Sequence, residues 1–100
     1  MIDTKNNITK NEMKKLHNNQ FLIVREELNK VDPLGIIDNE KLVNEYDLEN
    51  EYILTHLYKV KDEFELAEKI AEIFFNTCDI KSTSDKWLTC AKNILNKIKK

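Results

Sequence analysis

Residues 62–78, which read DEFELAEKIAEIFFNTC, carry the clearest helical pattern in the chain. Their apolar side chains recur every three or four positions, and this spacing places them on one face of an α-helix. Asp62 is a candidate N-cap, and Glu65 follows it at the spacing of a capping box. The segment is therefore expected to form a central helix, with a wide apolar stripe made of Leu66, Ala67, Ile70, Ala71, Ile73, Phe74 and Cys78.

Three further segments show helical periodicity, and none alternates in the manner of a β-strand. The first begins near Thr9 or Asn11, the second near Asp47, and the last at STSD, residues 82–85, where Ser82 and Asp85 have capping-box spacing. We predict an all-α, single-domain bundle of four main helices over residues 1–100, with residues 1–8 frayed. The expected stripes are Phe21, Val24, Leu28 and Val31 in the first helix, Leu48, Tyr52, Ile53, His56, Leu57 and Val60 in the second, and Trp87, Leu88, Ala91, Ile94, Leu95 and Ile98 in the last.

The composition is that of a water-soluble domain, with 41% apolar and 34% charged residues among 100. The longest apolar run, FLIV at residues 21–24, is far shorter than the ~20 residues that a membrane-spanning helix needs. The first fifteen residues show no signal-peptide pattern. We therefore expect a cytoplasmic protein that does not enter a membrane, with Cys78 and Cys90 as free, partly or wholly buried thiols.

About fifteen residues separate the first two predicted helices, and they hold the only proline and the only glycine of the chain. Asp32 and Pro33 suit the N-cap and first position of a short helical turn. Gly35 can adopt a left-handed conformation there at little cost. We expect a long, ordered connector that turns back so that its apolar side chains, Leu34, Ile36 and Ile37, reach the core.

No pattern in the sequence indicates catalysis. The two histidines, His17 and His56, lack metal-ligand spacing to another histidine or cysteine, and neither an HExxH nor a CxxC motif is present. A chain with one glycine cannot form a glycine-rich phosphate loop. We therefore predict a protein that is not an enzyme and needs neither a metal nor a cofactor.

Charge is unevenly distributed along the chain. Residues 31–79 hold thirteen acidic residues and four lysines, whereas the last twenty-one residues hold six lysines and one aspartate. A lysine-rich end raises the possibility of nucleic-acid binding, but a pI of 5.7 and the absence of a recognised motif make it the weaker interpretation. The densest acidic stretch covers residues 38–51 and comprises Asp38, Glu40, Glu45, Asp47, Glu49 and Glu51.

This acidic stretch has three interpretations, and the weakest is a carboxylate metal site, because the spacing matches no known calcium loop. Carboxylates near a helix start are favoured by the helix dipole and by the free N–H groups there, so they can be purely structural. Alternatively, clustered carboxylates can form a docking surface that speeds association with a basic partner.

Four short motifs in order resemble the YugE-like family, a small, all-helical bacterial family of unknown function. They are DPLG at 32–35, NEYD at 44–47, the segment 62–78 and CAKNIL at 90–95, and the resemblance spans roughly residues 20–98. Val31 stands where that family usually has a bulky aromatic residue, and the proline often seen in the following loop is missing. The resemblance implies a compact helical bundle without known enzymatic activity, with signature positions at Asp32, Pro33, Gly35, Glu45, Tyr46 and Asp47.

In size, charge and helicity the chain is also similar to immunity proteins of bacterial toxin–immunity pairs. This likeness implies a protein-binding module whose acidic residues cover the basic face of a toxin domain, such as a nuclease. The alternative is a small structural or regulatory protein that forms homodimers. Leu22 and Phe75 suggest it, because each falls beside its apolar stripe and would be exposed.

Overall fold

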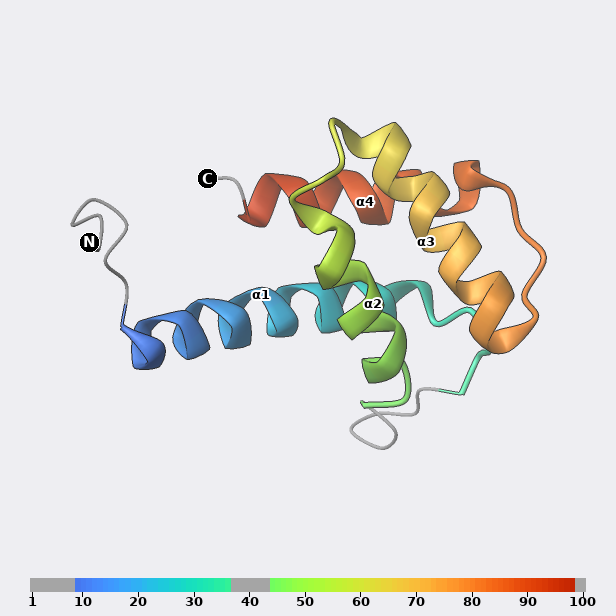
Figure 1. Ribbon diagram of the computed structural model, residues 1–100. Coiled ribbons are helices and arrows are strands. Elements are labelled where there is room, and N and C mark those ends of the chain that lie inside the picture. The colour runs from blue at the N-terminus through green and yellow to red at the C-terminus, as the bar shows by residue number, and fades with distance from the viewer. Residues whose placement is uncertain (1–8, 37–43, 99–100) are drawn as a thin grey trace.

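The computed structural model describes residues 9–36 and 44–98, and these form four α-helices (Figure 1). They are α1 (Lys10–Val31), α2 (Asp47–Leu57), α3 (Glu63–Cys78) and α4 (Ser84–Ile98), and no strand occurs in the described part of the chain. The predicted all-α bundle of four main helices is thus confirmed. The expected fraying of residues 1–8 lies outside the described residues.

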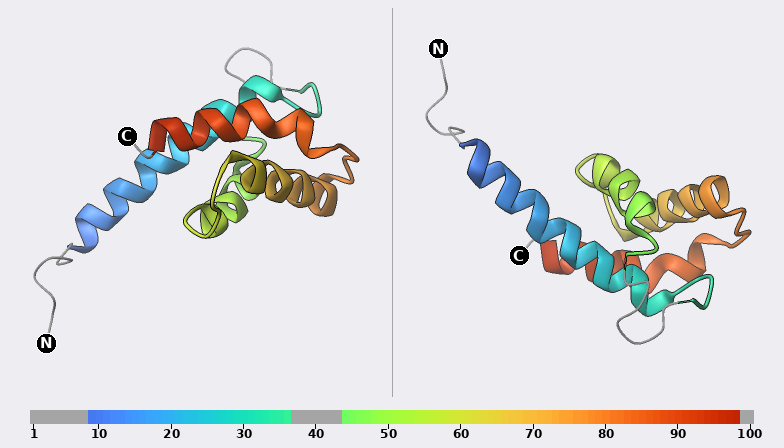
Figure 2. Two further views of the ribbon diagram at one scale, coloured as in Figure 1. Left: turned by 90° about the horizontal axis from the view of Figure 1, so that it is seen from above. Right: turned by 90° about the horizontal axis from the view of Figure 1, so that it is seen from below.

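The helices pack in a ring, α1 on α2, α2 on α3, α3 on α4 and α4 back on α1. Two layers result: α4 runs antiparallel beside the C-terminal half of α1, and α2 and α3 lie together on one side of that pair (Figure 2). The N-terminal half of α1 extends beyond both layers. This extension accounts for the elongated outline of 48 × 30 × 23 Å.

Aromatic stacking fills the centre of the bundle. Phe74 of α3 stacks on Trp87 of α4 with ring centroids 4.7 Å apart, and Tyr46 meets the edge of Phe74 at 5.6 Å. All three rings are at most 2% exposed. The central place predicted for residues 62–78 is confirmed, since α3 buries Leu66, Ala67, Ile70, Ile73 and Phe74. Cys90 is a buried free thiol and Cys78 a half-buried one, as expected.

The caps at the helix starts agree with the sequence in two cases. Thr9 and Glu12 form a reciprocal capping box at the start of α1. Asp62 caps α3 by accepting the N–H of Glu65. The box expected from Ser82 and Asp85 is wrong, because α4 begins only at Ser84. The Ser82 hydroxyl instead accepts the indole N–H of Trp87 at 3.0 Å.

The stripe predicted for α2 is wrong in part. Leu48 and Tyr52 are 57% and 45% exposed, and the inward positions next to them are Glu49 and Asn50. The reason is that α2 contacts α1 on one side and α3 on the other. Its inward face is therefore turned from the stripe we expected, although Ile53 and Leu57 belong to both.

Candidate functional site

The connector is fastened at its two ends by one side chain, Tyr46. The Tyr46 hydroxyl donates to Asp32 Oδ1 at 2.7 Å and accepts the backbone N–H of Leu34 at 3.0 Å. Burial, and then the hydrogen bond to Asp32, raise the pKa of Tyr46 far above its ordinary value of 10. We call Asp32, Leu34 and Tyr46 the connector clamp. Residues from two of the motifs behind the family resemblance, DPLG and NEYD, thus hold each other.

Asp32 has a different role from the one expected. It is the C-cap of α1, in a left-handed conformation (φ 47°, ψ 64°), with its N–H bonded to the carbonyl of Leu28. The turn expected at Asp32 and Pro33 does form, since the N–H of Gly35 bonds to the Asp32 carbonyl at 2.9 Å and the Asp32 carboxylate accepts the N–H of Ile36. The expected N-cap conformation of Asp32 is wrong, because Asp32 is the C-cap of α1 and lies in the left-handed region. The left-handed conformation expected for Gly35 is confirmed by its φ of 67°.

The apolar side chains of the connector divide between core and surface. Ile36 packs against the core, as expected, whereas Leu34 is 43% exposed, contrary to the prediction. The inward-facing group of Leu34 is its backbone N–H, which donates to the buried Tyr46 hydroxyl. Ile37 lies outside the described residues.

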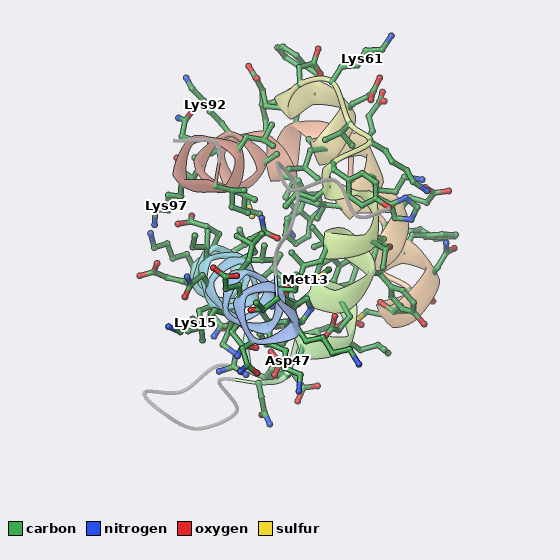
Figure 3. The ribbon with its side chains drawn as sticks, turned by 60° about the vertical axis from the view of Figure 1, so that its left-hand side comes forward. Met13, Lys15, Asp47, Lys61, Lys92 and Lys97 are labelled. Carbon is green, nitrogen blue, oxygen red and sulfur yellow. The ribbon has the colours of Figure 1, made fainter. Side chains whose placement is uncertain are left out.

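Asp47 is occupied within the fold. Its two carboxylate oxygens accept from Arg25 Nε and Nη2 at 3.1 and 2.6 Å, which is a bidentate pair across the α1–α2 seam. Hydrogen bonding to Asp47 raises the pKa of Arg25, whose guanidinium also lies 5.2 Å from the Phe21 ring centroid. Figure 3 shows Asp47 where these two helices meet. Asp47 therefore joins α2 to α1, and its carboxylate is already engaged within the fold.

Glu49 points inward. It is 5% exposed, and the thiol of Cys78 donates to its Oε2 across 3.6 Å. Burial, with the neighbouring Glu49 charge, raises the pKa of Cys78, so the thiolate needed for nucleophilic chemistry is disfavoured there. Glu49 was expected to contact a partner, but in this structure its carboxylate does not reach the surface.

Two of the six acidic residues, Glu45 and Glu51, are exposed, and Glu51 lies 3.3 Å from Nε2 of the equally exposed His17. On α2 beside Glu51 lie the exposed apolar side chains of Leu48 and Tyr52, one helical turn apart, and Glu45 lies just before the helix begins. We call these four residues the α2 outer face. Helical spacing alone predicts that Leu48 and Tyr52 face the core, which the structure contradicts. Asp38 and Glu40 lie outside the described residues.

The two layers of the bundle carry opposite charge. Helices α2 and α3 together hold seven carboxylates and one lysine, a formal charge of −6. Helices α1 and α4 hold eight basic and four acidic residues, a formal charge of +4. The acidic residues in the middle of the sequence are therefore concentrated in the layer formed by α2 and α3, and the α2 outer face lies on this layer.

A groove of about 390 Å³ runs between α2 and α3 beside this face. Within it, Lys69 Nζ lies 2.8 Å from Glu72 Oε1, and this pair lowers the pKa of Glu72. The groove is open to solvent and its lining mixes apolar and polar groups: Tyr52, His56, Lys69, Glu72, Ile73, Asn76 and Thr77. Tyr52 therefore borders both the α2 outer face and the groove.

The seam between α1 and α4 contains a buried charge that helical periodicity did not single out. Glu27 is 1% exposed and accepts from Lys97, Lys30 and Asn93 at 2.6, 3.1 and 3.3 Å. Burial raises the pKa of Glu27, but the hydrogen bonds from these three partners outweigh it, and the net pKa is lowered. Glu27 therefore stays ionised and joins the two helices.

Within residues 9–36 and 44–98, no three histidine, cysteine or acidic side chains converge as metal ligands would. None of the described helices combines the length and the apolar character required to cross a bilayer. Leu22 and Phe75 are exposed, as expected, and lie on α1 and α3, which do not pack against each other.

No family model, no curated protein and no solved structure matches this chain. The resemblance to the YugE-like family therefore stays a prediction.

Proposed function

We propose that this protein is a non-enzymatic binding module of the immunity type, which occludes the basic face of a cognate toxin domain such as a nuclease. The observation that carries the proposal is the α2 outer face. Leu48 and Tyr52 are exposed one turn apart on α2, with the exposed carboxylates of Glu51 on the same helix and Glu45 just before it. An apolar centre with an aromatic anchor and a charged rim is the usual anatomy of a protein interface.

Each part of this face has a separate task in the proposed complex. Tyr52 anchors the partner, because an aromatic ring buries a large area while losing few rotamers. The carboxylates of Glu45 and Glu51, within a layer of formal charge −6, attract a basic partner and speed its association. Since Asp47 and Glu49 are engaged inside the fold, the proposed contact no longer includes them.

Occlusion accounts for inhibition without any reaction. A nuclease binds phosphates through lysine and arginine side chains. An acidic surface that covers those side chains competes with the nucleic acid for the same site. The proposed inhibition needs no catalytic group on this chain. We also propose that the protein acts in the cytoplasm, because such a toxin would act there.

The test uses the protein encoded by the neighbouring gene as the candidate toxin. Its purified terminal domain is immobilised, and binding of the full chain is followed by surface plasmon resonance at low and high salt. We expect a complex whose association rate falls as salt rises. The absence of a complex at low salt would reject the proposal for that partner.

Two matched pairs of variants locate the contact. Glu45→Lys should slow association several-fold, whereas Asp85→Lys, the same reversal of an exposed acid on α4, should not. Tyr52→Ala should speed dissociation at least about tenfold, as expected of an interface anchor. Tyr58→Ala removes an 80% exposed tyrosine just beyond α2 and should leave the complex unchanged. If the two variants of either pair had equal effects, the partner would not bind at the α2 outer face.

A further inference from the structure

The N-terminal half of α1 lacks the cover that the rest of the helix has. Every residue from 10 to 19 is exposed along roughly 15 Å of helix, although His17, near its inner end, lies 3.3 Å from Glu51 of α2. Met13 and Leu16, its two large apolar side chains, are 59% and 52% exposed. A helical segment of this length is marginal in water without packing, so covering it would stabilise it.

The uncovered half continues the core-facing stripe of the same helix. Met13 precedes Val31 by eighteen residues, which is five helical turns, so the two side chains point in the same direction. Figure 3 agrees: seen along α1, Met13 lies on the side that faces α2, and Lys15 lies on the opposite side. The face that α2 and α4 cover further along is thus presented to solvent at residues 10–19.

The charge of this half indicates what can cover it. Lys10 and Lys14 lie within about 100° of Met13 around the helix, and residues 10–19 hold three lysines and one glutamate. A second copy of the same basic segment would be repelled. The α2 outer face has the complementary character, since it combines Leu48 and Tyr52 with Glu45 and Glu51 in the acidic layer.

Within one chain this match is met at one point, where His17 Nε2 lies 3.3 Å from Oε1 of Glu51. Met13 and Lys10 lie about one and two turns further out on the same continuous helix, α1, which would have to break to bring them onto the outer face of its own α2. Two copies can satisfy it twice, since each offers one basic projecting helix and one acidic α2 outer face. A reciprocal contact of this kind is what a two-fold symmetric dimer requires.

We propose that two copies of this chain form a dimer in which the projecting half of α1 from each copy docks on the α2 outer face of the other. The dimer needs no other partner, so it stands independently of the immunity-type function. Both use the α2 outer face, and therefore dimerisation and partner binding exclude each other.

The first test is the molar mass of the full-length protein, measured by sedimentation equilibrium at low and high salt. We expect a dimer at low salt whose dissociation constant rises at least tenfold at high salt. A monomer at all accessible concentrations and low salt would overturn the proposal. So would a dimer that salt does not weaken.

The second test reverses the charges on each side. Lys10→Glu/Lys14→Glu and Glu45→Lys/Glu51→Lys should each give monomers, because each homodimer would then oppose like charges. An equimolar mixture of the two variants should restore a dimer, since both contacts again pair opposite charges. Lys15→Glu/Lys92→Glu reverses two exposed lysines on other faces and should dimerise like the wild type. If the mixture stays monomeric, the two surfaces do not meet.

A third variant tests the apolar part of the contact. Met13→Ser/Leu16→Ser alters only exposed side chains and so should leave the fold intact, as circular dichroism can verify. We expect it to abolish the dimer and, by freeing the α2 outer face, to raise the apparent affinity for a basic partner. A dimer of unchanged affinity would rule out the projecting half as the docking segment.

Discussion

The two halves of α1 follow one periodic pattern but have opposite surroundings. The C-terminal half buries Val24, Glu27 and Leu28 against its neighbours and ends in the connector clamp. The N-terminal half is held by a local capping box at Thr9 and exposes every residue from 10 to 19. An apolar stripe therefore shows which side chains share a face of a helix, but it does not show how much of that face is covered.

The largest difference between the two halves should appear in matched leucine substitutions. Leu28→Ala removes a fully buried side chain and should lower the free energy of unfolding by about 2–5 kcal/mol. Leu16→Ala, the same change at a 52% exposed position, should alter it by less than about 0.5 kcal/mol. Urea unfolding followed by tryptophan fluorescence measures both, at high salt to exclude association. Similar losses would mean that both halves are covered in solution.

A second pair of variants compares buried and exposed carboxylates on the covered half. Glu27→Ala leaves Asn93 without its acceptor and Lys97 without its closest one, and it should cost about 2–3 kcal/mol. Glu26, whose side chain is 61% exposed, also bonds to Lys97, but Glu26→Ala should leave the unfolding midpoint nearly unchanged. A larger effect at Glu26 would contradict the assignment of Glu27 as the link between α1 and α4.

The same carboxylate sets an expected pH dependence. The pKa of Glu27 is lower in the folded state than its ordinary value of 4.5, so the folded state binds this proton less tightly than the unfolded state. Its contribution to stability is therefore complete above pH 4.5 and is lost as the pH falls through the folded-state pKa. The stability difference between wild type and Glu27→Gln should shrink on acidification. A difference independent of pH would contradict this.

A smaller effect is expected at the connector clamp, where the covered half ends. Tyr46→Phe removes the hydroxyl that bonds Asp32 and Leu34 but keeps the ring against Phe74. We expect a loss of about 1–2 kcal/mol in the free energy of unfolding, because the N–H of Leu34 loses its partner. Amide exchange at Leu34 should quicken more than at Ile53. Uniform quickening would show only global destabilisation.

The smallest effect should come from helix caps, compared between a covered and an uncovered helix. Asp62→Ala removes the cap of α3 and should lower the global stability by about 0.5–2 kcal/mol. Thr9→Ala removes the same kind of cap from the projecting half and should only increase fraying of residues 10–19, without moving the unfolding midpoint. Amide exchange by NMR at high salt distinguishes the two outcomes. A shifted midpoint for Thr9→Ala would mean that the uncovered half contributes to the global fold.

The sequence predicts the helices well because their evidence is local. Apolar spacing and the cap residues Thr9 and Asp62 lie within a few positions of the structure that they specify. The prediction from sequence is wrong for Leu48 and Tyr52 of α2, because both share helical spacing with the core residues of that helix. Which face of α2 turns inward depends on its contacts with two neighbouring helices, and spacing does not report these contacts. The hydrogen bond from Tyr46 to Asp32 escaped prediction because it joins positions 14 apart.

The candidate site shows the same division. The acidic residues were found from their density alone, which cannot tell an exposed carboxylate such as Glu45 from a buried one such as Glu49. Asp47 and Glu49 differ from the exposed carboxylates because each has a partner within the fold, Arg25 for Asp47 and Cys78 for Glu49. Both partners lie on other helices, so local sequence spacing does not reveal them. Projection of half of α1 beyond the bundle depends on where α2 and α4 end, and periodicity carries no information about that.

The connector clamp also determines how freely the length of the chain can vary. Tyr46 holds Asp32 directly, and α2 is further joined to α1 by the Arg25–Asp47 pair and by the bond from Asn50 to the Phe21 carbonyl, so the helix packing does not depend on the number of residues between Asp32 and Tyr46. A longer segment between these two points costs only loop-closure entropy, about 0.6 kcal/mol for each doubling. We therefore expect an insertion between Ile36, which packs against the core, and Tyr46 to leave the packing of the described helices unchanged, so that an epitope tag or a fluorophore attachment site could be placed there.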